Sequence, residues 1–269
     1  MFNKIEDKEI FDLKVKLAAN LRDARSFLKI YKMGFTGGTT KQITAGILFE
    51  SLCTRSHSFF TLASSMIEPE QDENAWDSPS LCTLSRSILD SRAAFFYLCV
   101  ERCKKYERSV RYASFYLHHI EAKKTLCLLD GDATTPMMYE IMADQTITAL
   151  EKNPFFISLG EGLQKSIKTG KKNFLEPIED VLERSGIKKS TYKYLQKSWS
   201  HHVHSYPMMV ADSGLLGSGA RTNSEAALVC QCMDFVTYVL EQTMKNIAHT
   251  INLRSRISGK KLKKAMPEC

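Results

Sequence analysis

The polar residues with the clearest potential for chemistry lie inside an otherwise apolar helical stretch. At roughly 100° per residue, Arg86, Asp90 and Tyr97 fall within about 40° of one another on a helix. An arginine and an aspartate at i and i+4 can pair, and both need partners if they are shielded from water. Two interpretations stay open. The residues form an internal salt bridge that fixes helix packing, or they form an anion or substrate site in which Asp90 orients Arg86.

A second polar cluster occupies the segment Trp199-Ser-His-His-Val-His-Ser205. Ser200 and His204 share one helix face at i, i+4, and His201 lies beside His204 at i, i+3. Four interpretations compete here: a metal site, a Ser–His nucleophile pair, a general acid or base, and structural histidines favoured by the dipole at a helix C-terminus. No acidic or cysteine third ligand lies nearby in sequence, so we expect neither a metal ion nor another cofactor.

Helices must position both clusters, because apolar residues recur every three or four positions and almost no alternation with a period of two is present. Thr39 with Gln42, and Thr222 with Glu225, have the form of capping boxes, and Ser78-Pro79 predicts a helix start. The resulting prediction is an all-α antiparallel bundle of about six to eight helices. The expected helices cover residues 6–33, 41–66, 78–103, 107–128, 135–153, 176–186, 190–205 and 222–254, with one short helix at most in 155–173.

Composition and charge limit the possible classes of protein. The chain has 269 residues, of which 43% are apolar and 25% charged, so disordered and fibrous classes are excluded. We expect a single domain over residues 1–253 and a basic tail over 254–269, where six basic residues face only Glu268. The tail is either solvated or in contact with phosphates. The eight cysteines have no zinc spacing, and no secretory signal or membrane span is evident, so we expect a reduced, cytoplasmic protein.

These motifs resemble those of a bacterial all-helical family of domains of unknown function. Ser85-Arg-Ser-Ile-Leu-Asp-Ser-Arg-Ala-Ala-Phe-Phe-Tyr-Leu98 resembles its Arg-Ser-x-x-Asp/Glu helix. Tyr192-Lys-Tyr-Leu-Gln-Lys-Ser-Trp-Ser-His-His-Val-His-Ser205 is similar to its Tyr-x(n)-Ser-x-x-x-His element, with Ser200 and His204 in matching places. The segment 106–124 is similar too, and the match covers roughly residues 45–206.

Families of this shape are similar to HEPN domains, helical bundles of bacterial toxin and phage-defence systems that often pair and cut RNA without metal. The resemblance implies a HEPN-like fold, a homodimer, RNA or another nucleic acid as partner, and no membrane span. HEPN ribonucleases use an Arg-x(4–6)-His motif, which is missing around His204. Arg111 and His118 match it formally, but a chain with 12 arginines and 7 histidines is expected to contain roughly one such match by chance.

Two functions therefore compete. In the first, a HEPN-like effector acts on nucleic acid or nucleotides as a metal-independent ribonuclease, with Arg86, Asp90 and His204 as catalytic residues. Its substrate contacts would be Tyr97, Ser200 and His201. In the second, the chain is a non-catalytic protein-interaction module whose basic tail docks a partner. The absence of a Gly-rich loop ending in Gly-Lys-Ser/Thr argues against a Walker-type nucleotide hydrolase.

Overall fold

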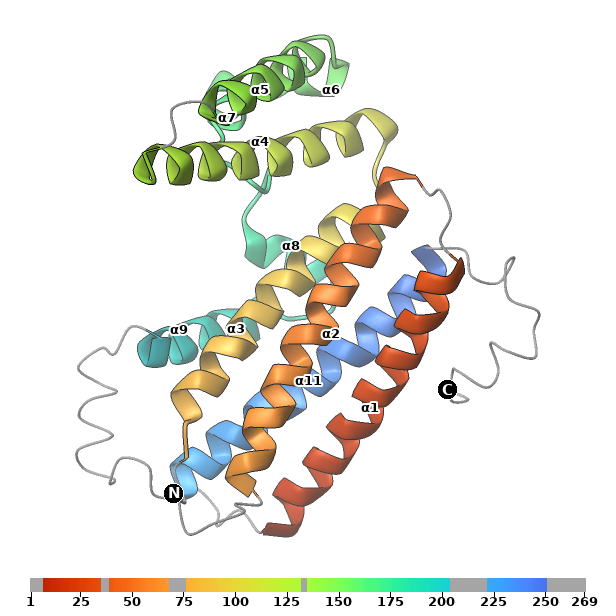
Figure 1. Ribbon diagram of the computed structural model, residues 1–269, viewed down its shortest axis with the longest axis vertical. Helices are drawn as coiled ribbons and strands as arrows, with labels where there is room; N and C mark the ends of the chain where they lie inside the picture. Colours follow the sequence, from red (N-terminus) through yellow and green to blue (C-terminus); the bar gives the residue numbers. More distant parts are fainter. Residues whose placement is uncertain (1–6, 35–38, 68–75, 132–134, 204–221, 251–269) are drawn as a thin grey trace. The chain divides into compact units, whose positions relative to one another are not determined.

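The computed structural model describes residues 7–34, 39–67, 76–131, 135–203 and 222–250 (Figure 1). These described residues form ten α-helices and one π-helical turn, and no strand is found among them. The prediction of an all-α protein is confirmed. The predicted count of six to eight helices is not confirmed, because three short helices of 4, 8 and 7 residues add to the longer ones.

Two compact units divide the chain, the first comprising residues 1–100 and 185–269 and the second residues 101–184. The residues of the expected single domain, 1–253, are thus divided between two units. That they form one domain stays a prediction. The basic tail, 254–269, lies outside the described residues.

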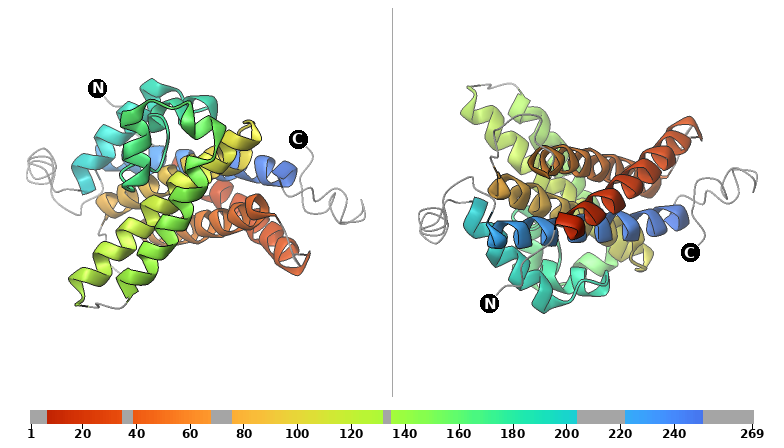
Figure 2. Two further views of the ribbon diagram at one scale, coloured as in Figure 1. Left: turned by 90° about the horizontal axis from the view of Figure 1, so that it is seen from above. Right: turned by 90° about the horizontal axis from the view of Figure 1, so that it is seen from below.

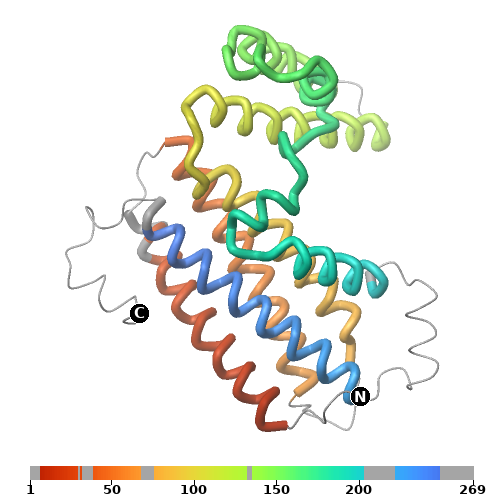
Figure 3. The backbone as a smooth tube through the Cα atoms, turned by 180° about the vertical axis from the view of Figure 1, so that it is seen from behind, coloured from red at the N-terminus to blue at the C-terminus, as the bar shows by residue number. Residues whose placement is uncertain are grey.

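The first unit is built from five long α-helices and the π-helical turn. In chain order these are α1 (Asp7–Gly34), α2 (Thr40–Ile67), α3 (Ser78–Phe95), η1 (Phe96–Val100), α9 (Lys189–Val203) and α11 (Asn223–Thr250). Helix α2 packs against α1 and α3, and α11 packs against the same three helices (Figure 1). Helix α9 lies beside α3, as the view from behind shows (Figure 3).

The starts of these helices follow from local side-chain caps. Thr39 and Gln42 form the predicted capping box, in which the Thr39 amide donates to Gln42 Oε1 at 3.0 Å and the Gln42 amide donates to Thr39 Oγ1 at 3.3 Å. Thr222 and Glu225 do the same at the start of α11. For α3, the cap is Asp77 rather than the predicted Ser78, since Asp77 Oδ1 accepts the Ser80 amide at 3.1 Å.

The core of the first unit comes from the predicted 3.6-residue periodicity. On α1 the buried residues are spaced by three, four or seven positions: Ile10, Leu17, Leu21, Ala24, Phe27 and Tyr31. Trp199 of α9 has no exposed surface, and its ring packs edge-to-face on Phe235 of α11, with ring centroids 5.0 Å apart. This contact joins α9 to α11 in the core of the unit.

The second unit consists of two long helices and three short ones: α4 (Lys105–Leu129), α5 (Thr135–Glu151), α6 (Pro154–Ile157), α7 (Glu161–Lys168) and α8 (Ile178–Arg184). Helices α4 and α5 lie side by side (Figure 2). They share a buried apolar cluster with α6 and α7: Val110, Leu117, Leu150, Phe156 and Ile167. The predicted loop over 155–173 therefore contains two short helices, of which α6 is capped by Asn153 Oδ1.

Charged side chains hold the polar edge of the second unit together. The Arg111 guanidinium bonds Glu101 at 2.5 Å and Glu107 at 2.6 Å, and Arg184 bonds both Glu101 and Glu176. The Glu101 side chain is only 12% exposed. Burial alone would raise the pKa of Glu101, but hydrogen bonds from Arg184 and Arg111 outweigh it, so the pKa is lowered. The ionised form of Glu101 is therefore favoured in the folded state.

Replacing Glu101 by glutamine is expected to lower the free energy of unfolding by about 3 kcal/mol at neutral pH, because it leaves two arginines short of a nearly buried partner. A carboxylate whose pKa is lowered on folding stabilises above its unfolded pKa, and this contribution is lost as the pH falls through the folded value. The difference between Glu101→Gln and wild type should therefore be constant above about pH 5 and shrink in acid.

Urea unfolding at pH 7 and pH 3 measures this difference. The matched control is Glu151→Gln, since Glu151 is 53% exposed and its one ion pair among the described residues is with Lys168, and an exposed pair contributes less than about 1 kcal/mol. A Glu101→Gln variant as stable as the control variant at pH 7 would contradict the prediction.

Candidate functional site

Two hydrogen bonds between polar side chains join α3 to its neighbours in the first unit, one to α9 and one to α2. Arg86, on α3, donates from Nη1 to Ser200 Oγ on α9, and both side chains are half-buried. The two sequence motifs, separated by 114 positions, are thus in direct contact. Ser200 directly follows the buried Trp199 on α9. We call Arg55, Arg86, Asp90, Ser91 and Ser200 the Arg86 cluster.

A second arginine, which sequence reasoning missed, belongs to the same cluster. Arg55 of α2 is half-buried and donates from Nη1 to Ser91 Oγ on α3. Ser91 is 6% exposed, and its hydroxyl donates in turn to the Ser87 carbonyl at 2.8 Å. One signal in the sequence could have found Arg55. No acidic residue lies within four positions of it, so a helix offers it no carboxylate on the neighbouring turns.

Asp90, on α3, interacts electrostatically with both of these arginines. Asp90 is exposed on α3, but partial desolvation of its carboxyl raises its pKa, and the positive charges of Arg86 and then Arg55 oppose that rise. No ion pair within 4 Å joins Asp90 to either arginine in the described part of the chain. The internal Arg86–Asp90 salt bridge, one of the two interpretations of the sequence, is therefore not formed, because Arg86 turns toward Ser200 instead.

The other three predicted site residues are His201, Tyr97 and His204, and their surroundings differ. His201 follows Ser200 on α9 and is half-buried. Tyr97 is 1% exposed and lies in the π-helical turn η1, against which α2 and α11 pack. A buried Tyr97 offers no surface to a ligand from solvent, so Tyr97 is not part of the candidate site. His204 lies outside the described residues, and the distance from Arg86 to His204 stays a prediction.

Arg111 and His118, the residues of the formal Arg-x(6)-His match, make structural contacts in the second unit. Arg111 is held by Glu101 and Glu107, as described above, and its side chain is 7% exposed. His118 Nδ1 lies 2.7 Å from the Gly170 carbonyl oxygen. Both side chains are committed to protein contacts, so this pair offers no phosphate site.

Chemically, the Arg86 cluster suits an anion. Each guanidinium has five N–H donors in a planar fork that fits phosphate oxygens. Arg86 and Arg55 each direct hydrogen bonds to a neutral serine hydroxyl, so their charge is not cancelled by a paired carboxylate. Within the described ranges, no group of three or more histidine, cysteine or acidic residues is placed to hold a metal ion.

Comparisons with protein-family models, with curated proteins and with solved structures find no match to this chain. The resemblance to HEPN-like families therefore remains an expectation drawn from the motifs. None of the helices in the described ranges has the length and apolar character that crossing a bilayer requires.

Proposed function

We propose that this chain is an RNA-acting effector that binds a phosphodiester at the Arg86 cluster and cleaves it without metal. The observation that carries the proposal is the pair of half-buried guanidiniums, Arg86 and Arg55, whose hydrogen bonds go to serines rather than to carboxylates. A bacterial toxin or phage-defence system is the setting that the HEPN resemblance implies.

The proposed chemistry uses the positions of the two motifs. Arg86 uses one donor on Ser200 and keeps others for two phosphate oxygens, where it offsets the negative charge that develops as a fifth oxygen approaches phosphorus. His204 follows directly after α9, which ends at Val203. In the proposed step His204 accepts the proton of the ribose 2′-hydroxyl as the 2′-oxygen attacks phosphorus. The 5′-oxygen leaves with a proton from water, so the products are a 2′,3′-cyclic phosphate and a 5′-hydroxyl.

Asp90 has a different role in this proposal from the one expected from the sequence. It does not orient Arg86 by a direct bond, since Ser200 does that. Its carboxylate instead reduces the repulsion between the two guanidiniums while no phosphate is bound, because its negative charge attracts both arginines.

The test is cleavage of a labelled single-stranded RNA by the purified full chain in the presence of excess EDTA. We expect products that end in a 2′,3′-cyclic phosphate, and we expect His204→Ala to lower the rate by about 100-fold or more, the range typical of a general base. His118→Ala is the matched control, because His118 contacts Gly170 in the second unit and should leave the rate unchanged. Intact RNA at high protein concentration, or equal cleavage by His204→Ala, would contradict the proposal.

One observation favours a second candidate, a non-catalytic protein-interaction module. Six large apolar side chains are more than half exposed where α4 ends and α5 begins: Leu126, Leu128, Leu129, Met137, Met138 and Ile141. Such a concentration on a soluble surface is typical of a protein-binding site. This candidate predicts that RNA stays intact in the same assay although the protein is folded.

A further inference from the structure

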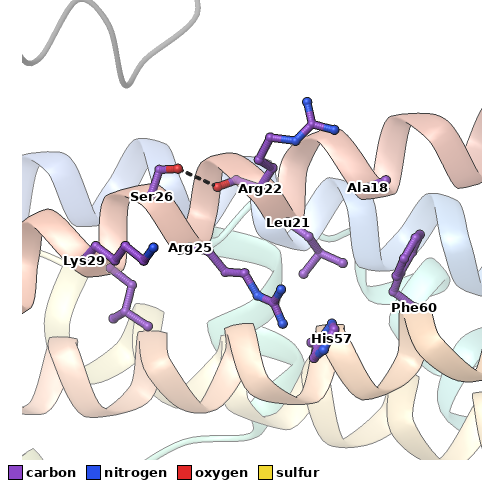
Figure 4. Close-up of a pocket in the computed structure, with 9 residues that line it drawn as sticks. Ala18, Leu21, Arg22, Arg25, Ser26, Lys29, His57 and Phe60 are labelled. Atoms are coloured by element: carbon purple, nitrogen blue, oxygen red, sulfur yellow. Dashed lines mark hydrogen bonds between the residues drawn. The ribbon is translucent and has the colours of Figure 1, made fainter.

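A cleft between α1 and α2 combines positive charge with apolar walls, and it lies on a different face of α2 from Arg55. Its volume is about 700 Å³, which is within the range of small-molecule sites. Basic side chains line it together with apolar and small ones, as Figure 4 shows: Arg22, Arg25, Lys29 and His57, and Ala18, Leu21, Ser26, Leu28 and Phe60.

The basic residues of the cleft repel one another. Arg22, Arg25 and Lys29 are exposed and follow at i, i+3 and i+7, which places them on one face of α1. No acidic residue lines the cleft, and within the described part of the chain none of the three forms an ion pair. Like charges at this spacing destabilise a helix by a few tenths of a kcal/mol per pair. A bound anion would reverse that effect.

Arg25 and His57 point toward each other across the cleft, whereas Arg22 points away from α2 (Figure 4). Burial lowers the pKa of His57, and the positive charge of Arg25 lowers it further. Two hydrogen-bond donors therefore face each other across a cleft that no acidic residue lines. A phosphate group placed there would accept hydrogen bonds from both.

The remaining walls suit a flat apolar group. Leu21 is buried, and Leu28 and Phe60 are half-buried, so each offers part of its apolar surface to the cleft. Phe60 lies at one end of the row of residues drawn in Figure 4. Aromatic side chains stack on nucleobases of any sequence, at about 1–3 kcal/mol per base. Phosphate and base are two of the three parts of a nucleotide, and the sugar joins them.

We propose that the α1–α2 cleft binds a nucleotide, with its phosphates at Arg25 and His57 and its base against Phe60. The site is separate from the Arg86 cluster, and the inference does not rest on RNA cleavage. The nucleotide is free in solution or is part of a single-stranded RNA. Both sources supply the same chemistry, so the experiment includes one probe for each.

Isothermal titration of the purified full chain with three probes tests the proposal: ATP, inorganic tripolyphosphate, and a ten-nucleotide RNA with 2′-O-methyl groups that cannot undergo attack by a 2′-hydroxyl. We expect ATP or the RNA to bind more tightly than tripolyphosphate, because only they carry a base. Binding of ATP identifies a free nucleotide as the ligand, and binding of the RNA alone identifies a strand. Equal affinity for tripolyphosphate and for both nucleotide probes would overturn the proposal.

Two variants assign the binding to the cleft. Arg25→Gln should weaken nucleotide binding at least tenfold, since it removes a charged hydrogen-bond donor from an exposed position that does not support the core. Phe60→Ala should weaken binding of the nucleotide but not of tripolyphosphate. Lys8→Gln, an exposed substitution at the start of the same helix, is the control and should bind as wild type does. Nucleotide binding by Arg25→Gln at wild-type affinity, with an unchanged melting temperature, would refute the assignment.

Discussion

Replacing Arg86 by alanine is expected to reduce the rate of RNA cleavage by about 100- to 1000-fold, the loss typical when one preorganised donor to a developing oxyanion is removed. Arg86 is half-buried and is fixed by its hydrogen bond to Ser200, so its guanidinium needs little reorganisation when a phosphate binds. Arg86→Lys keeps the charge but loses the planar fork, and its rate should lie between those of wild type and Arg86→Ala. Single-turnover cleavage in EDTA measures all three rates.

Three outcomes separate a role in phosphate binding from a role in holding α3 to α9. Ser200→Ala removes the same hydrogen bond but leaves the guanidinium in place, so its rate should fall by much less than that of Arg86→Ala. Arg108→Ala removes another half-buried arginine, which donates to the Cys103 carbonyl at 3.3 Å, and should leave the rate unchanged. If Ser200→Ala loses as much activity as Arg86→Ala, the contact is structural and the phosphate role is wrong.

Replacing Arg92 by methionine is expected to raise the free energy of unfolding by about 2 kcal/mol, an unusual direction for a fully buried residue. Arg92 is 1% exposed, and its Nε and Nη1 atoms have no hydrogen-bond partner in the described structure. Burial lowers its pKa to about 10, and the Tyr238 side chain only partly opposes this. A shift of this size corresponds to roughly 3 kcal/mol of destabilisation of the charged form.

Cation–π contacts with two aromatic rings offset part of this destabilisation of the charged Arg92. The Arg92 guanidinium carbon lies 6.0 Å from the Phe95 ring centroid and 5.7 Å from that of Phe96. A desolvated cation–π contact contributes about 2 kcal/mol at most. Methionine has a similar length and no charge, so it keeps the packing and removes the desolvation penalty.

Thermal and urea unfolding of Arg92→Met at pH 7 measure the effect, which should appear as a rise in melting temperature of several degrees. Because the pKa of Arg92 is lowered on folding, the penalty is present below the folded pKa of about 10 and decreases as the pH rises through it, so the advantage of methionine should shrink above pH 10. Arg92→Lys keeps a buried charge and should not stabilise. An Arg92→Met variant less stable than wild type would contradict the prediction.

Much of the local structure could be predicted from the sequence because it depends on neighbours in the chain. The start of α2 and the start of α11 were both predicted from capping boxes, and both boxes are present. The long helices end within a few residues of the predicted bounds, because apolar periodicity and glycine or proline stops are properties of short segments. The two short helices over 155–173 were missed, since segments of four and eight residues carry little periodicity.

The candidate site was predicted only in part. The structure places Arg86 in contact with Ser200 of the serine–histidine motif, whereas the expected approach of His204 to Arg86 stays a prediction, since His204 lies outside the described residues. The burial of Tyr97 could not be derived from helical periodicity, because it depends on α2 and α11, which pack against η1. The sequence shows that Arg55 has no carboxylate on the neighbouring turns of its helix, but it could not show that Arg55 contacts Ser91, which is 36 positions away.

The sequence by itself determined that the chain is helical and where most helices begin and end, because hydrogen bonds within helices, caps and periodic burial act over a few residues. Only the tertiary structure decided which charges are paired. It joined Arg184 to Glu101, 83 positions away in the chain, turned Arg86 from Asp90 to Ser200, and left Arg92 buried without a carboxylate. These outcomes depend on how helices far apart in the chain pack and rotate against one another, which no short segment specifies.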